Sequence, residues 1–198
     1  MSESGLNRAE AALVRLARGN EMYLTEGRGW TDLSPERRIE VTQHGQRPFA
    51  AIVTCSDSRV PPEHIFSAGL GDIFVVRSAG NVVGDFERGA IEFAAQHLGV
   101  PLVVVMGHSQ CGAVAAALAR REEAVAGDSL AAVVREIREG LGDACGADEA
   151  VRANIQQSIR RILESAIVTQ MVEAGRLMVT GAEYDLRTGL VEFLRDNK

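Results

Sequence analysis

The sequence predicts an α/β protein: a single domain with a mainly parallel central sheet flanked by helices, plus an N-terminal helical arm. Short apolar runs rich in β-branched residues at 49–54, 73–77 and 102–106 are continuous rather than alternating, which is typical of strands buried on both faces. Helical periodicity between them fits the crossover connections of a parallel sheet. The length of 198 residues suits one domain, which we divide into an arm (1–45) and an α/β core (46–198).

The arm is expected to contain two helices. Residues 6–26 repeat apolar side chains with a helical period, and most of the charged side chains fall elsewhere on the same helix. A shorter helix is expected at 36–43, where Ser34 can accept a hydrogen bond from the first turn and Pro35 suits the first helical position.

The core is expected to alternate strands with helices. The strand patterns are bounded by turn residues, and glycine follows the first core helix as a stop signal. The expected elements are a strand at 49–54, a loop at 55–62, a strand at 73–77, a helix at 87–98, a strand at 102–106, a helix at 113–121, a partly helical stretch at 121–148, a long helix at 150–174 and strands at 177–180 and 190–194.

Composition excludes several classes of function. A net charge of −6, with 21 basic residues that form no dense patch, argues against nucleic-acid binding. No apolar run approaches the roughly 18 residues of a membrane-spanning helix. The N-terminus lacks the pattern of a secretory signal, so we expect a cytoplasmic protein. Three cysteines, an odd number, do not suggest a disulfide framework, which favours metal binding or catalysis instead.

Potential metal ligands follow two of the predicted strands at the points where the apolar runs end. Cys55 comes directly after the first run, and His108 and Cys111 come just after the third. Ligands of open α/β sheets bind beyond the carboxyl ends of the strands. Two thiolates and an imidazole are ligands that zinc prefers, and catalytic zinc sites keep a fourth position open. We therefore predict one zinc ion on these three residues, whereas Cys145 is expected to take no part.

Two further side chains could serve this zinc site. Two thiolates cancel the charge of Zn²⁺, so a bound water needs help to lose its proton. Asp57, kept ionised and oriented by Arg59, could accept the proton of zinc-bound hydroxide in a hydrogen bond and aim its lone pair at an electrophile. Asp57 could instead move onto zinc as a fourth ligand and close the site. The alternative is that the two residues form an ordinary salt bridge within a loop.

These residues lie in segments that resemble the β-class carbonic anhydrases, and the match covers most of the chain. The matching segments are C-S-D-S-R-V-P-P-E at 55–63, G-D-I-F-V-V-R-S-A-G-N at 71–81, I-E-F-A-A-Q-H-L-G-V at 91–100, G-H-S-Q-C-G-A-V at 107–114 and G-A-E-Y-D-L-R-T-G at 181–189. The resemblance implies zinc on Cys55, His108 and Cys111, with Asp57 and Arg59 as a catalytic pair. It also implies reversible hydration of carbon dioxide to bicarbonate and a proton by zinc-bound hydroxide.

The resemblance further implies a substrate pocket and an oligomer. Gln46 stands where some members hydrogen-bond substrate, Phe74, Ala79 and Phe93 match apolar pocket positions, and the Gly112 backbone N–H matches a group that contacts substrate. Simple core packing remains the alternative for the apolar residues. Members of the family form dimers, often paired into tetramers, so these residues could serve the zinc of a neighbouring chain.

The same resemblance bears on regulation. Members that bicarbonate inhibits at a non-catalytic site carry tryptophan three residues before the first zinc cysteine, where this chain has Ile52, although Arg77 matches a basic residue of that site. We therefore expect an open zinc site near neutral pH. Two other functions remain possible on these residues: hydrolysis of carbonyl sulfide or carbon disulfide at the same zinc, and a non-catalytic zinc-binding role.

Overall fold

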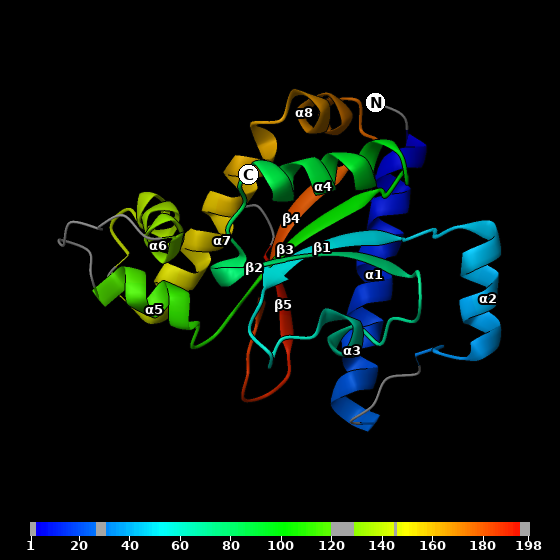
Figure 1. The fold of residues 1–198 in the computed structure, drawn as a ribbon, viewed down its shortest axis with the longest axis horizontal. Coiled ribbons are helices and arrows are strands. Elements are labelled where there is room, and N and C mark those ends of the chain that lie inside the picture. Colours follow the sequence, from blue (N-terminus) through cyan, green and yellow to red (C-terminus); the bar gives the residue numbers. More distant parts are fainter. Residues whose placement is uncertain (1–2, 27–30, 120–128, 145, 195–198) are drawn as a thin grey trace.

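A five-stranded sheet forms the centre of the computed structural model, which describes residues 3–26, 31–119, 129–144 and 146–194 (Figure 1). The strands are β1 (Ala50–Cys55), β2 (Ile73–Ser78), β3 (Leu102–His108), β4 (Met178–Tyr184) and β5 (Val191–Leu194). They lie in the order β2-β1-β3-β4-β5. The first four are parallel, and β5 runs antiparallel to β4. The mainly parallel sheet is therefore confirmed.

Strands β1 and β3 are central, and every residue of both is buried. Successive side chains of a strand point to opposite faces. Accordingly, Val53 and Val105 pack into one core layer, whereas Ile52 and Val104 pack into the other. Burial on both faces is the reason that these two segments read as continuous apolar runs.

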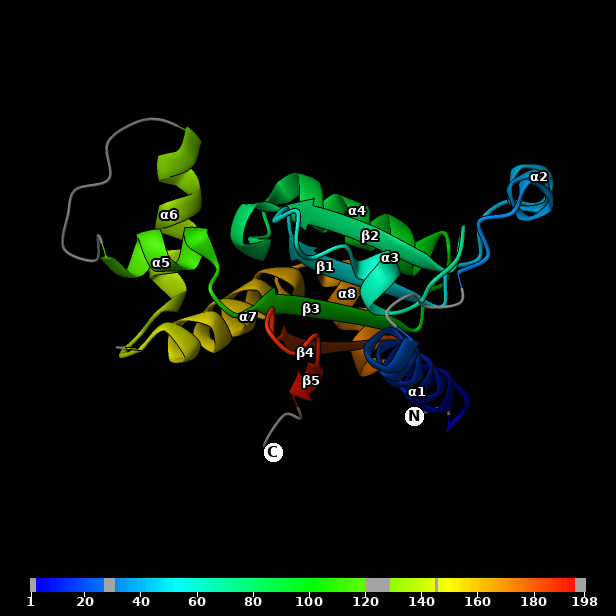
Figure 2. The same ribbon diagram turned by 90° about the horizontal axis from the view of Figure 1, so that it is seen from below.

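Helices cover both faces of this sheet (Figure 2). The helices are α1 (Glu3–Glu26), α2 (Pro35–His44), α3 (Pro62–Ile65), α4 (Asp85–Gln96), α5 (Gly112–Ala119), α6 (Ser129–Gly140), α7 (Ala147–Leu163) and α8 (Ala166–Glu173). Side chains of α4, α7 and α8 belong to one core layer, and those of α1 and α3 to the other. None of the described helices combines the length and apolar character needed to cross a membrane.

Helices α2 and α5 lie at opposite ends of the sheet in both views (Figures 1 and 2). Helix α2 begins as expected, because the Ser34 hydroxyl accepts a hydrogen bond from the Arg37 N–H at 3.1 Å and Pro35 occupies the first turn. None of its residues is buried. It precedes the amino end of β1, whereas α5 follows the carboxyl end of β3.

The long helix predicted at 150–174 is wrong, because two helices occupy this stretch. The break falls at Ser165, whose hydroxyl accepts from the Val168 N–H at 3.3 Å, as a helix cap does. The same hydroxyl donates to Glu92 at 2.6 Å, which fixes the corner against α4. Leu163, the last residue of α7, is 39% exposed.

Smaller differences concern short or irregular elements. Helix α3 was not predicted, because one turn of helix gives no periodicity; Pro62 at its first position was the available signal. The stretch at 121–148 contains α6. The last residues of the helix predicted at 113–121, and Cys145, lie outside the described residues.

Candidate metal centre

The three predicted ligands meet at the carboxyl edge of the two central strands. Cys55 is the last residue of β1 and His108 the last of β3, and these strands pair in parallel with Thr54 beside Met106. The Sγ atoms of Cys55 and Cys111 and an imidazole nitrogen of His108 form a group in which all three ligand atoms lie within 4.8 Å of one another. All three side chains are buried. The structure therefore brings together the residues that the sequence singled out.

A tight turn carries the chain from His108 to Cys111. Gln110 has a φ of 57°, in the left-handed region, which reverses the chain within three residues. The turn is anchored to the end of β4, because the Ser109 N–H donates to the Tyr184 carbonyl at 2.9 Å. Helix α5 begins at Gly112, so the thiol of Cys111 lies at a helix N-terminus, which favours a thiolate.

His108 is prepared to bind a metal ion through Nε2. Its Nδ1 lies 2.9 Å from the Ser109 carbonyl oxygen, which can only accept, so Nδ1 carries the proton. Nε2 is then an acceptor with a free lone pair, and it has no hydrogen-bond partner among the described residues although the ring is fully buried. A buried, unpartnered nitrogen beside two thiols fits a zinc ligand.

The two thiols perturb each other because they are close. Hydrogen bonding with the Cys111 thiol lowers the pKa of Cys55, and the Gly80 N–H adds to that effect. The pKa of Cys111 is raised, first by its interaction with Cys55 and then by burial. Without a metal ion the pair therefore favours one thiolate and one thiol. A bound divalent cation would lower the pKa of the second thiol as well, because metal-bound thiols are deprotonated.

Asp57 and Arg59 form a two-pronged salt bridge next to this group. The Arg59 Nε and terminal nitrogen donate to the two carboxylate oxygens of Asp57 at 2.9 and 2.7 Å, and the Arg59 backbone N–H donates to Oδ1 at 2.9 Å. The Arg59 side chain holds the pKa of Asp57 well below its usual range. Asp57 Oδ2 also lies 4.0 Å from His108 Nε2, so the carboxylate borders the proposed metal position.

Arg77 holds the backbone from which these groups project. Its guanidinium donates to the carbonyl oxygens of Cys55 and Asp57, at 3.1 and 2.7 Å. The loop after β1 is therefore fixed at two points by a residue of the neighbouring strand β2. In the sequence, Arg77 is recognisable only as a match to a basic residue of a regulatory site. The available signal for its structural role is its position near the end of a strand.

The predicted substrate residues fall into two groups. Ala79 and Gly112 are exposed and lie next to the three ligands, since Gly80 contacts Cys55 and Gly112 follows Cys111. Gln46, Phe74 and Phe93 do not lie there. Gln46 is exposed before the amino end of β1.

The two phenylalanines lie together, away from the metal centre of their own chain. Phe74 pairs with Ala51 on β1, four residues before Cys55. Four residues of extended chain span about 13 Å. The ring of Phe93 lies 6.3 Å from that of Phe74, and 46% of Phe93 is exposed.

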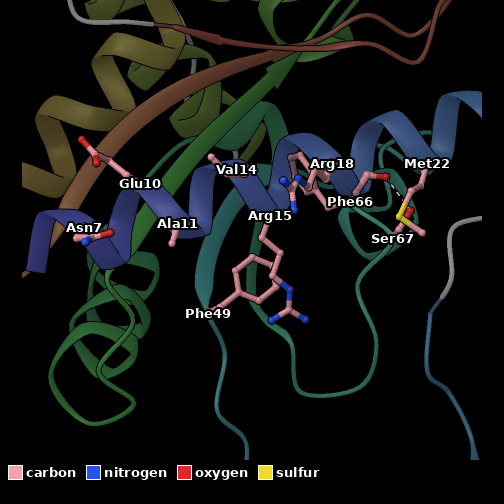
Figure 3. Close-up of a pocket in the computed structure, with 11 residues that line it drawn as sticks. Asn7, Glu10, Ala11, Val14, Arg15, Arg18, Met22, Phe49, Phe66 and Ser67 are labelled. Carbon is pink, nitrogen blue, oxygen red and sulfur yellow. Dashed lines mark hydrogen bonds between the residues drawn. The ribbon is translucent and has the colours of Figure 1, made fainter. Parts of the chain in front are cut away.

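A groove beside α1 is a second concave feature of the described structure (Figure 3). It has a volume of about 660 Å³ and is lined by side chains of α1 together with Phe49 and Phe66. Its most prominent cation, Arg15, is already engaged, because it stacks on the Phe49 ring at 3.9 Å and pairs with Asp72 at 2.8 Å. The groove brings together no pair of nucleophile and base, so the group at Cys55 remains the candidate.

Comparison with known proteins agrees with this geometry. A family model described as carbonic anhydrase matches residues 50–191. The carbonic anhydrase of Mycolicibacterium smegmatis is 40% identical over 167 residues, covering 79% of each chain. Carbonic anhydrase 2 of Mycobacterium tuberculosis is 36% identical over 197 residues, covering 94% of this chain and 93% of that protein.

Solved structures give the same result. The Coccomyxa β-carbonic anhydrase in complex with acetazolamide superimposes with a TM-score of 0.70 at 27% identity, covering 81% of this chain and 78% of that one. The β-carbonic anhydrase CafA of Aspergillus fumigatus gives 0.69 at 28% identity, covering 96% and 91%. The fold, the three clustered ligands and these matches place the chain in one family: it belongs to the β-class carbonic anhydrases.

Proposed function

We propose that this protein is a zinc lyase that catalyses the reversible hydration of carbon dioxide to bicarbonate and a proton. The observation that carries the proposal is the buried group of Cys55, His108 and Cys111, bordered by an ionised Asp57. Family membership makes Zn²⁺ the cofactor, at one ion per chain. We assign its ligands to the two sulfurs and to His108 Nε2. When bound, the ion supplies a Lewis acid that activates water toward an electrophile.

Asp57 is assigned the role of a hydrogen-bond acceptor that orients the reacting water. Its carboxylate remains ionised well into the acid range because Arg59 donates to both oxygens. The same two hydrogen bonds fix its direction, so that its remaining lone pairs can receive a hydrogen bond from the reacting water. Arg77 also stabilises the position of Asp57, because its guanidinium donates a hydrogen bond to the Asp57 carbonyl.

The paired state of Asp57 favours an open metal site. To become a fourth ligand, the carboxylate would have to leave both Arg59 nitrogens, which is an unfavourable exchange while Arg59 stays nearby. We propose that the closed arrangement is a minor state near neutral pH. A zinc-loaded structure with Asp57 on the metal at neutral pH would contradict this.

The remaining substrate residues are assigned to an assembly of copies. Ala79 and Gly112 border the metal centre of their own chain, whereas Phe74 and Phe93 lie too far along the sheet to reach it. We propose that Gln46 and these two rings complete the centre of a neighbouring copy in a homodimer or tetramer. The expected cytoplasmic location remains a prediction.

The test is a stopped-flow assay of the zinc-loaded protein, with carbon dioxide and carbonyl sulfide as competing substrate classes. We expect rapid hydration of carbon dioxide, loss of activity when a chelator removes the metal, and recovery on adding Zn²⁺. A strong preference for carbonyl sulfide would instead assign the site to hydrolysis of sulfur analogues. No turnover of either substrate by fully loaded protein would leave a non-catalytic zinc-binding role.

A further inference from the structure

Two buried side chains of α7 hold the backbone of the turn at residues 79–81, here called the 79–81 turn. Asn154 Nδ2 donates to the Gly80 carbonyl at 2.7 Å, and Ser158 Oγ donates to the Asn81 carbonyl at 2.8 Å. Both side chains are only 1% exposed. Because residues four apart share one face of a helix, α7 presents a matched pair of donors to two successive carbonyls.

The 79–81 turn has a backbone shape that needs outside support. Gly80 has a φ of 64° and Asn81 a φ of 49°, both in the left-handed region. Such a conformation is strained for a non-glycine residue, whereas glycine populates either sign of φ freely. A side chain at position 80 would also force its neighbours to shift, because its Cβ would lie 2.8 Å from Ile137 Cδ1 and 3.0 Å from Ala113 Cβ. The hydrogen bonds from α7 therefore select one shape for a segment that would otherwise have several.

The selected shape directs an amide at a metal ligand. The Gly80 N–H donates to the Cys55 sulfur at 3.3 Å. A hydrogen bond to a thiolate stabilises its charge and reduces the charge that it gives to a metal ion, as outer-shell partners generally do. Asn154 is thus connected to Cys55 through a single residue, which accepts at its carbonyl and donates at its amide.

Asn154 occupies its position at a cost. Its Oδ1 is buried and has no hydrogen-bond partner among the described residues. An unsatisfied buried acceptor is destabilising, and leucine, of similar shape, would avoid that cost. The hydrogen bond from Nδ2 to the Gly80 carbonyl is the contact that justifies a polar side chain here.

We propose that Asn154 is a positioning residue for the metal centre: by holding the Gly80 carbonyl, it keeps the Gly80 N–H on the Cys55 sulfur and limits the charge that this thiolate donates to the metal. The inference rests on the proposed function only in taking Cys55 as a metal ligand. It requires no particular substrate.

Cobalt substitution tests this, because thiolate ligands give sulfur-to-cobalt charge-transfer absorption. The energy of that absorption falls when the sulfur loses a hydrogen bond. In Asn154→Leu we expect the band to move to longer wavelength at full cobalt occupancy. The matched control is Gln157→Leu, on the same helix: Gln157 is 8% exposed and hydrogen-bonds to Glu136 and Arg160 rather than to the 79–81 turn. Its band should not move.

A second measurement needs no variant, so it remains decisive if Asn154→Leu does not fold. In wild-type protein loaded with ¹¹³Cd, the Gly80 amide proton should show scalar coupling to the metal nucleus through the Cys55 sulfur. Absence of this coupling would overturn the proposal, as would bands that stay in place in Asn154→Leu or move equally in both variants. Cobalt that binds without any thiolate band would overturn the ligand assignment, and with it the proposed function.

Discussion

The two ends of the sheet differ in how completely one chain builds them. At the carboxyl end, Cys55, His108 and Cys111 are buried, and their surroundings are fixed by main-chain hydrogen bonds and by Arg77. Toward the amino end, Gln46 and Phe93 are exposed and Phe74 is partly exposed, and Phe74 pairs with Ala51, four residues before Cys55. The comparison indicates that a single chain gathers the three proposed metal ligands, whereas the proposed substrate pocket calls for residues of a second copy.

The largest expected effect is the loss of metal binding at the carboxyl end of the sheet. His108→Ala removes one of three ligands and the only nitrogen among them, so the purified protein should lose nearly all of its zinc and its hydration activity. Metal analysis against protein concentration measures this. The control is His44→Ala, at the exposed end of α2, which should keep one zinc per chain. Stoichiometric zinc in His108→Ala would show that the ligand set is different.

A smaller effect separates metal binding from catalysis at that same end. Asp57→Asn keeps the shape of the side chain but replaces a charged hydrogen-bond acceptor of the reacting water, so kcat/KM should fall by about 10²–10⁴-fold. The zinc content should not change, because Asp57 pairs with Arg59 rather than completing the ligand group. Asp85→Asn, exposed on α4, is the matched control. Undiminished turnover in Asp57→Asn would remove Asp57 from the mechanism.

The third prediction tests the other side of the comparison. Phe74→Ala should lower kcat/KM about tenfold, which corresponds to about 1.4 kcal/mol of lost transition-state stabilisation. Co-expressing Phe74→Ala with His108→Ala should then recover activity above the mean of the two parents, because a mixed dimer contains one centre with intact ligands and an intact neighbouring ring. If the mixture gives only that mean, Phe74 serves no neighbouring chain.

The smallest effect concerns stability and pH. Arg59 depresses the pKa of Asp57 in the folded state, so the pair stabilises the fold above the unfolded pKa of about 3.9 and loses that contribution as pH falls through the folded value. For a pair with Arg59 half exposed, the contribution is about 0.2–1 kcal/mol. Denaturant unfolding of metal-free wild type and Asp57→Asn should therefore differ at pH 7 and converge in acid. A difference that grows toward low pH would contradict the assignment.

The clustering of Cys55, His108 and Cys111 could be predicted because each lies at or just beyond the end of a readable strand, and parallel strands end at one edge. From the sequence, Asp57 and Arg59 could be a catalytic pair or an ordinary salt bridge within a loop. The structure shows the salt bridge, and the catalytic role stays a prediction. The break at Ser165 escaped prediction, because the apolar period continues across it; Ser165 as a helix-capping residue was the available signal. The contact of Asn154 with Gly80 is non-local: 74 residues separate the two, and no sequence period reports which polar side chain of a helix faces a given turn.

The central position of β1 and β3 also bears on how the protein loses its metal. The hydrogen bonds of strands in the middle of a sheet are usually exposed only by global unfolding, which is the rarest of the protein's fluctuations. Because Cys55 and His108 terminate these two strands, the chelating geometry persists for as long as the core does. Zinc release and thermal melting should therefore coincide, and the amide protons of both strands should be among the last to exchange with deuterium.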